Sequence, residues 1–351
     1  MRILEDVKLD FNDILILPHR SVLTSRSEVS LDRTFIFRNS KQNWTGTPLI
    51  AANMDTVATF IMAKTLAEHN VATALHKHYP LEQLIEFFNN LPEHQRDLVF
   101  YSIGLRTEEL EKFNLFKKSL NHTLKMLCVD VPSAYIEKFI QLVSKLREEN
   151  PDTTILAGNV VTAEITEALI LAGADIIKVG IGSGVVCTTR KMTGVGLPQF
   201  SAILDTADAA HGLKGLICSD GGIVYPGDLG KAFGGGADFV MMGGAFAGHD
   251  ECESEIVERD GKKFVKFYGM SSHEAQKTHY GEIRKYRASE GRETLIPYKG
   301  SVISTLQEYL GGLRSTMTYI GATKLKEVSK RTTFVKVNRT INTAYEQYEK
   351  K

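Results

Sequence analysis

Eight short apolar runs, separated by stretches with helical periodicity, most constrain how this chain can fold. Each run is apolar on successive residues, as expected for a parallel strand that is buried on both faces. The stretches between them, such as 133–150 and 162–174, carry apolar residues at i, i+3 and i+4 spacing, which predicts amphipathic helices. The eight runs are 48–54, 71–76, 98–104, 124–131, 153–160, 174–182, 215–222 and 237–244.

Eight strands alternating with helices predict a (β/α)8 barrel, which is an α/β fold. A doubly wound sheet is the main alternative, but the Gly-x-Gly-x-x-Gly that usually follows its first strand is absent. In a barrel the chemistry lies at the carboxyl ends of the strands. Polar residues and glycines are therefore expected to share one rim; they include Asn53, Asp55, His76, Lys77, His78, Gly104, Asp130, Asn159, Asp220 and Gly243.

The charge balance and the cysteines limit the class of protein. The 351 residues contain 42 Lys plus Arg and 42 Asp plus Glu, so no overall charge favours nucleic acid or an acidic membrane. No apolar run reaches the roughly 18 residues of a spanning helix, and the first residues lack the pattern of a secretion signal. Four widely spaced cysteines argue against a disulfide framework. We therefore expect a cytoplasmic protein, with residues 1–351 as one barrel domain.

The regular order breaks after the eighth run. Residues 245–300 contain a predicted hairpin, with Asp260-Gly261 at its turn, and then a polar stretch. An insertion of this length is expected to be a lid over the site. Helical spacing resumes from Val302 to about Thr318 and predicts the last outer helix. The tail, 335–351, shows no core pattern and is expected to be loosely held.

The stretch KVGIGSGVVCTTRKMTGVG, residues 178–196, places one cysteine in a glycine-rich loop after the sixth run. Cys187 has three interpretations: a buried structural thiol, a metal ligand or a nucleophile. The nearby Arg190 and Lys191 and the position on the rim would expose the thiol and favour its thiolate, as nucleophilic chemistry requires. Cys128 and Cys218 lie in apolar runs, where we expect them to be core residues, and Cys252 lies in the insertion.

Glycine pairs follow the seventh and eighth runs, Gly221-Gly222 and Gly243-Gly244. Barrels often bind phosphate at this place, so the two pairs favour a phosphorylated ligand, although tight turns also need glycine. His76-Lys77-His78 suggests a metal, but a zinc site needs further ligands, and the other strand ends offer no histidine. Lys77 is interpreted either as a cation that faces a charged ligand or as a solvated rim lysine.

The cysteine loop, GIGSGVVCTTR followed by TGVG-x-PQ, resembles the catalytic loop of the IMP dehydrogenase and GMP reductase family. SDGG, MMGG and YGMSS are similar to the nucleotide-binding stretches of that family, and KYRASEG is similar to a late active-site segment of its reductase branch. The similarity extends from Leu9 to about Phe334. RASEG and the lack of a domain-sized insert after the second strand favour the reductase branch over the dehydrogenase branch.

This resemblance implies an NADPH-dependent reductive deamination of GMP to IMP and ammonia, a step of purine nucleotide salvage. Cys187 would attack C2 of the guanine ring, ammonia would leave a covalent thioimidate, and NADPH would deliver hydride to C2. Thr189 and Glu290 would move the proton that the leaving amine needs. The resemblance also implies a homo-oligomer, a tetramer.

The binding residues are likewise implied by the resemblance. GMP would be held by Asp220, Gly221, Gly222, Gly243, Gly244, Gly269, Met270, Ser271, Arg287, Ala288, Ser289, Glu290 and Gly291. NADPH would lie near Ser25, Arg26, Lys77, Asp130, Val131, Pro132, Gly182, Met270, Tyr286, Arg287, Ser315, Thr316, Met317 and Thr318. A monovalent cation, K⁺, would be bound at Gly182, Gly184, Cys187 and Arg190.

The sequence departs from the family pattern in two places. Residues 182–185 read Gly-Ser-Gly-Val where the family usually has Gly-Pro-Gly-Ser, so Val185 lacks a hydroxyl for the nucleotide phosphate. That loss costs about 1–3 kcal/mol of binding unless Ser183 or Ser271 compensates. Val131-Pro132 follows Asp130 where the reductases usually have an Asn-Gly turn, which affects the cofactor edge.

Three alternatives stay open. IMP dehydrogenase would use the same cysteine with NAD⁺ and water. A flavin- or sugar-phosphate-binding barrel is a more distant enzyme. A nucleotide-sensing barrel without catalysis is favoured by Val185, whereas the intact Cys187, Thr189 and Glu290 count against it.

Overall fold

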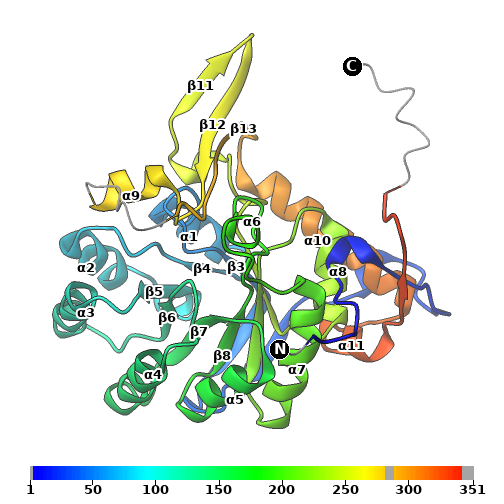
Figure 1. Cartoon of the computed structure of the whole chain (residues 1–351), viewed down its shortest axis with the longest axis horizontal. Coiled ribbons are helices and arrows are strands. Elements are labelled where there is room, and N and C mark those ends of the chain that lie inside the picture. The colour runs from blue at the N-terminus through cyan, green and yellow to red at the C-terminus, as the bar shows by residue number, and fades with distance from the viewer. Residues whose placement is uncertain (1–2, 281–287, 342–351) are drawn as a thin grey trace.

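A computed structural model, which describes residues 3–280 and 288–341, contains a closed parallel barrel at its centre (Figure 1). All eight predicted runs form its strands, each paired with its neighbour in chain order, and the eighth pairs with the first. The (β/α)8 prediction is therefore confirmed. The strands are β3 (Asn43–Ala51), β4 (Val71–Ala74), β5 (Val99–Ile103), β6 (Met126–Asp130), β7 (Thr154–Val160), β8 (Ile176–Val179), β9 (Leu216–Asp220) and β10 (Phe239–Met242).

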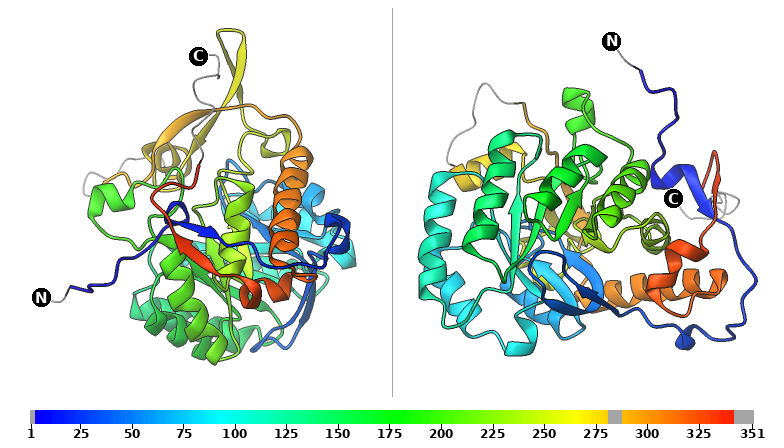
Figure 2. Two further views of the ribbon diagram at one scale, coloured as in Figure 1. Left: turned by 90° about the vertical axis from the view of Figure 1, so that its right-hand side faces the viewer. Right: turned by 90° about the horizontal axis from the view of Figure 1, so that it is seen from below.

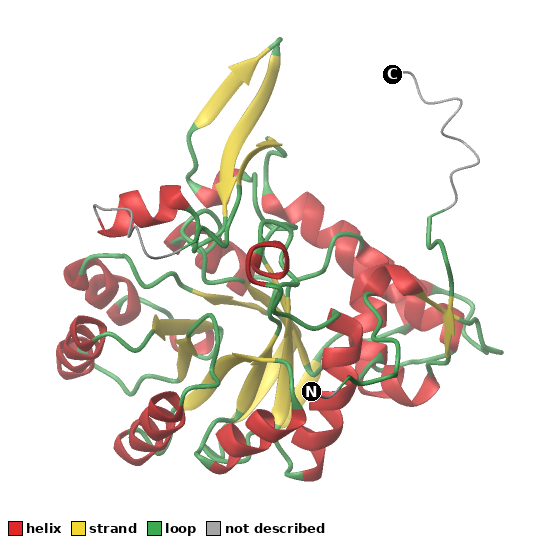
Figure 3. Ribbon diagram, in the orientation of Figure 1, coloured by secondary structure: helices red, strands yellow, loops and turns green. Residues whose placement is uncertain are grey.

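Helices surround the barrel and cover the outer faces of its strands (Figure 3). The last of them, α10 (Val302–Ile320), starts where the sequence predicts it and packs on α8. None of the described helices is long and apolar enough to cross a membrane. The others between the strands are α1 (Phe60–Ala67), α2 (Leu81–Asn89), α3 (Thr107–Ser119), α4 (Glu137–Glu149), α5 (Ala163–Leu171), α6 (Thr189–Thr193), α7 (Gln199–Gly212) and α8 (Pro226–Gly234).

The barrel interior is a packed apolar core because alternate strand residues point inward. Trp44 and Phe239 fill it at one end, with Phe35 of β2 (Arg33–Ile36) against both rings. Cys128 and Cys218 are fully buried in the same cluster, which confirms their prediction as core residues. Burial raises the pKa of the Cys128 thiol to about 12 and also raises that of Cys218, so neither thiol is a ready nucleophile.

The insertion after β10 forms a three-stranded antiparallel sheet and one helix, α9 (His273–Tyr280). The strands are β11 (Ile256–Arg259), β12 (Lys262–Tyr268) and β13 (Glu293–Pro297). Asp260 and Gly261 both have positive φ, 50° and 70°, as a tight hairpin turn requires, and the predicted hairpin is confirmed. The hairpin projects from the molecule, and α9 lies near its base (Figure 1).

A segment near each end of the chain lies against the other beside the barrel (Figure 2). β1 (Ile14–Ile16) pairs antiparallel with β14 (Phe334–Lys336), so Val335 and Lys336, the first residues of the expected loose tail, lie in a strand. The N-terminal segment then runs to the short helix η2 (Arg26–Glu28), which contacts α10. Residues 342–351 of the tail lie outside the described residues.

Candidate active site

The three side chains implied as catalytic contact one another in succession at the carboxyl ends of the barrel strands. The thiol of Cys187 lies 3.2 Å from Thr189 Oγ1, and that hydroxyl donates a 2.8 Å hydrogen bond to Glu290 Oε2. Cys187 and Thr189 come from the loop before α6 and its first turn, and Glu290 comes from the insertion, 101 residues further on. The thiol is half-buried, so it is reachable from the cavity described below.

Backbone contacts fix the insertion against the cysteine loop. The amide of Thr188 donates to the Glu290 carbonyl at 2.8 Å, and the Arg292 amide donates to the Val186 carbonyl at 2.9 Å. Gly291 pairs with Cys187 in an isolated bridge. A Cβ on Gly291 would stand 2.8 Å from the Ser272 amide nitrogen, so the close approach needs glycine. These contacts hold the backbone around Glu290 against the cysteine loop.

A cavity of about 230 Å³ opens beside the Cys187 thiol. Many of the implied substrate and cofactor residues line it, and they come from strand ends on opposite sides of the barrel as well as from the insertion. The implied residues in its wall are Asp130, Val131, Pro132, Gly182, Gly184, Cys187, Thr189, Asp220, Gly221, Gly269, Met270, Ser271 and Glu290.

The wall of this cavity contains a charged cluster whose central residue, Lys178, is missing from our sequence-based set of site residues. Lys178 Nζ contacts Asp130 Oδ1 at 2.9 Å, Asp220 Oδ2 at 2.6 Å and Asn159 Oδ1 at 3.0 Å. Burial would lower the pKa of Lys178, but the two carboxylates outweigh it and raise that pKa; Lys178 in turn holds the pKa of Asp130 low against the effect of burial. The signal was present in the sequence, since a lysine inside the apolar run 174–182 must find a carboxylate when buried.

One of the two glycine pairs expected at a phosphate site has the left-handed backbone that favours glycine. Gly221 and Gly222 have φ of 88° and 81°, and a Cβ on Gly221 would lie 2.7 Å from Ser183 Oγ. That hydroxyl donates to the Asp220 carbonyl at 2.7 Å. The Val185 side chain lies beside Gly244, 3.5 Å from the position of a Cβ there. An apolar group therefore stands beside a glycine of the expected phosphate site.

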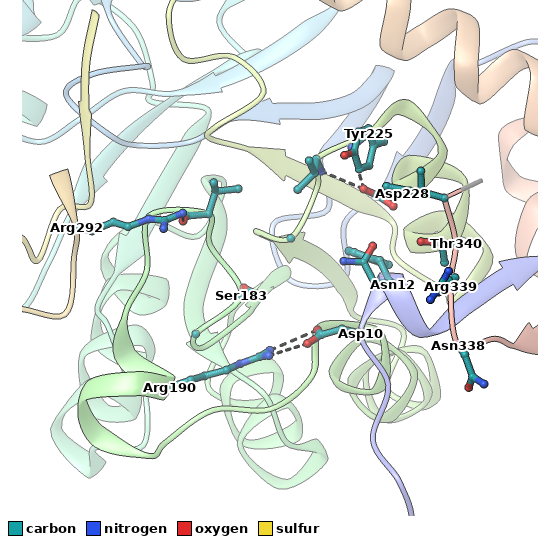
Figure 4. Close-up of a pocket in the computed structure, with 16 residues that line it drawn as sticks. Asp10, Asn12, Ser183, Arg190, Tyr225, Asp228, Arg292, Asn338, Arg339 and Thr340 are labelled. Carbon is teal, nitrogen blue, oxygen red and sulfur yellow. Dashed lines mark hydrogen bonds and ion pairs between the residues drawn. The ribbon is translucent and has the colours of Figure 1, made fainter. Parts of the chain in front are cut away.

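A larger cavity, about 580 Å³, lies on the other side of the cysteine loop (Figure 4). Gly182 and Ser183 line both cavities, so the loop forms the wall between them. Arg190 stabilises this wall. Its guanidinium donates to Asp10 at 2.6 Å (Figure 4) and to the Leu197 carbonyl at 2.7 Å. The chemistry-bearing side chains surround the smaller cavity, which we therefore take as the site.

Residues 8–346 match the model of the IMP dehydrogenase / GMP reductase domain. The chain belongs to the IMP dehydrogenase / GMP reductase family. It is 55% identical over 337 residues to the GMP reductases of Yersinia pestis (strain Pestoides F) and Yersinia pseudotuberculosis (serotype O:1b, strain IP 31758). The alignment covers 96% of this chain and 97% of each relative. The family match spans the cysteine loop, the Lys178 cluster and the insertion.

Residues that the family resemblance places near NADPH fall into two groups. Asp130, Val131 and Pro132 line the cavity, and Lys77 lies near Asp130 with its ammonium paired with Glu109 at 2.7 Å. Ser25 and Arg26 lie in or next to η2, which contacts α10, and they do not line the cavity around Cys187. The same holds for Ser315, Thr316, Met317 and Thr318 on α10.

Details within these groups limit what each residue can do. The Met317 side chain is fully buried, and Thr316 packs against Gly230 of α8. Ser289 donates to the Gly291 carbonyl at 2.8 Å, and Ala288 is exposed. Tyr286 and Arg287 lie outside the described residues.

The residues implied for K⁺ would offer backbone carbonyls, neutral oxygens of the kind that hold this ion in other proteins. The Gly184 carbonyl already accepts the Cys187 amide at 3.0 Å, and the Arg190 carbonyl accepts the Gly194 amide at 3.1 Å. Each carbonyl keeps a second lone pair, so these bonds leave room for a cation. Within residues 3–280 and 288–341, no cluster of three His, Cys, Asp or Glu side chains could hold a metal.

Proposed function

We propose that this protein is a GMP reductase, which converts GMP to IMP and ammonia with NADPH as the reductant. The hydrogen-bonded line from Cys187 through Thr189 to Glu290 is the observation that supports it most. A thiol, a hydroxyl and a carboxylate in contact can form a nucleophile and move its proton. The relatives named GMP reductase, at 55% identity over nearly the whole chain, support the choice of substrate.

In the proposed first step, a proton moves along the hydrogen bonds that join Cys187, Thr189 and Glu290. The Cys187 proton passes through the Thr189 hydroxyl to Glu290, and the thiolate forms a bond to C2 of the guanine. The C2–N bond then breaks, and Glu290 returns the proton through Thr189 so that the amine leaves as ammonia. NADPH, when bound, supplies the hydride that C2 takes up. The C2–S bond then breaks with its electrons returning to Cys187, which yields IMP.

The residues around the cavity offer groups that would suit the two ligands. Gly221 and Gly222 turn with positive φ where a phosphate would approach the backbone, and Lys77 supplies a cation near the expected cofactor edge. We further propose K⁺ at the carbonyls of Gly182, Gly184, Cys187 and Arg190, where it would brace the loop.

We propose a homotetramer in the cytoplasm. Two apolar side chains near η2 and α10 are largely exposed, Val22 at 88% and Tyr319 at 65%. Their exposure leaves both side chains available for contact with a second copy of the chain. Contact between copies would let the second group of cofactor residues, on η2 and α10, approach the cavity of another copy.

A direct spectrophotometric assay tests the proposed activity. Purified protein is mixed with GMP and NADPH, or with IMP and NAD⁺, and the absorbance of the reduced cofactor is followed, with Cys187→Ala as control. GMP-dependent loss of NADPH that disappears in Cys187→Ala is the expected result. NADH formed from IMP, with no reaction of GMP, would indicate a dehydrogenase. GMP binding without turnover would indicate a nucleotide sensor, the function that Val185 beside Gly244 favours.

A further inference from the structure

A buried carboxylate outside the catalytic line receives its hydrogen bonds from the insertion. Asp55 follows Asn53 and Met54, which line the cavity, and its side chain is 10% exposed. Among the described residues, its donors are the Tyr268 hydroxyl at 2.8 Å and His279 Nε2 at 2.5 Å. Tyr268 ends β12 and His279 lies in the last turn of α9, so both donors to this barrel carboxylate come from the insertion.

Stacked rings add a second contact between α9 and the barrel. The His279 ring lies parallel to that of His78, with 3.5 Å between their centroids and 11° between their planes. His76 stacks on Tyr79 at 4.0 Å, and Tyr79 stacks on Phe60 of α1 at 3.8 Å. The last turn of α9 is thus held by side chains that follow two neighbouring strands, β3 and β4.

The stability of the buried Asp55 carboxylate depends on the position of α9. Burial by itself raises the pKa of this carboxyl, but the His279 and Tyr268 donors outweigh it and hold the pKa below its ordinary value. Its second oxygen, Oδ1, is buried without a hydrogen-bond partner in the part of the chain that the structure describes. A carboxylate this buried is costly unless it is paired, so movement of α9 away from the barrel would remove the partners that stabilise it.

The segments on either side of α9 carry residues of the active site. Met270 and Ser271 lie between β12 and α9 and line the cavity, and Glu290 lies between α9 and β13. We propose that Asp55, with Tyr268, His279 and His78, forms a latch that holds α9 against the barrel, and that Asp55 is a positioning residue for Met270, Ser271 and Glu290. This inference rests on the proposed function only for its kinetic consequence.

Two variants break the latch in different ways. Asp55→Asn keeps the volume and removes the charge, whereas His279→Phe keeps a ring for stacking on His78 and removes the donor. His273→Phe makes the same exchange at an exposed residue in the first turn of α9 and is the matched control. Loss of one hydrogen bond to a charged group corresponds to about a tenfold effect on an equilibrium.

The first readout is native-state proteolysis, because it reports local opening. We expect trypsin to cleave after Lys277 of α9 about tenfold faster in Asp55→Asn and His279→Phe than in the wild type, with the thermal midpoint of the barrel nearly unchanged. The double variant should open no faster than the faster single variant, since both remove the same contact. Unchanged cleavage in both single variants would overturn the latch.

The second readout is turnover of GMP. We expect kcat/KM to fall about tenfold in both latch variants, through kcat as well as KM, with no change in His273→Phe. Faster cleavage with wild-type kinetics would overturn the positioning role of Asp55. If the wild type itself fails to turn over GMP, the proposed function fails, while the proteolysis result still decides whether the latch exists.

Discussion

Two groups of carboxylates at the carboxyl ends of the barrel strands differ in which elements supply their partners. Lys178 on β8 is surrounded by Asp130, Asn159 and Asp220 from β6, β7 and β9, so all its partners are barrel strands. Asp55 follows β3, but its donors come from the insertion. The first arrangement therefore belongs to the barrel itself, and the second joins two parts of the molecule.

The difference separates partners that belong to the barrel from partners that lie outside it. Strand pairing sets the Lys178 cluster, because Lys178 and Asp130 both pair with Gly158 in the ladder. These side chains cannot separate unless the barrel opens. The partners of Asp55 can separate while the barrel stays closed, since β12 and α9 lie outside the ring of strands. The Lys178 cluster should therefore contribute to global stability, and the latch should contribute to access to the cavity.

The largest expected effect is on the stability of the barrel. Lys178→Met removes the buried ammonium that Asp130 and Asp220, both half-buried, share, and we expect a loss of about 3 kcal/mol in the free energy of unfolding. Urea denaturation measures it, with Lys262→Met on the exposed hairpin as the control, where we expect about 0.5 kcal/mol or less. A loss below about 1 kcal/mol for Lys178→Met would mean that the cluster is not a structural element of the barrel.

A smaller effect, the dependence of stability on pH, should distinguish the region around His76 and His78 from the Lys178 cluster. Burial, followed by nearby cations, lowers the pKa of His76 to about 4 and of His78 to about 3, from 6.5. Between pH 6.5 and about 4 the unfolded chain therefore binds more protons than the folded chain, so stability falls as the pH falls. His279, Lys77 and Lys112 add to this effect, and Asp55 opposes it.

Urea denaturation at pH 7 and pH 5 measures this difference. We expect His78→Phe to remove about 1–2 kcal/mol of the acid-induced loss. The Lys178 cluster should contribute equally at both values, because the lowered pKa of Asp130 keeps its contribution until the pH falls below about 3.8. The same loss between pH 7 and pH 5 in the wild type and in His78→Phe would contradict the buried neutral state of His78.

Local patterns and the family resemblance predicted much of the molecule. Apolar runs predicted all eight barrel strands, although β3 starts before its run, at Asn43, and β8 contains Lys178. Asp260-Gly261 predicted the hairpin because its turn requires positive φ. The resemblance supplied Glu290, because a carboxylate in a polar stretch carries no local sign of a partner 101 residues away.

The remaining parts of the site depend on contacts between distant residues. Asp55 and His279 are 224 positions apart in the sequence, and no sequence pattern around either residue predicts their contact. Lys178 was recognisable in principle, since its run is otherwise apolar, but the strands that supply its carboxylates follow only from the closed barrel. Motif similarity also could not show that Ser25 and Arg26 lie apart from the cavity around Cys187.

The most direct test of the central claim is to find which side chain becomes bonded to the nucleotide. Turnover with GMP and NADPH is quenched in acid, and the digested protein is examined by mass spectrometry. The account predicts a purine nucleotide, lacking the amine of GMP, on the peptide that contains Cys187, with Cys128, Cys218 and Cys252 unmodified. Turnover with no adduct at Cys187, or an adduct on another cysteine, would contradict it.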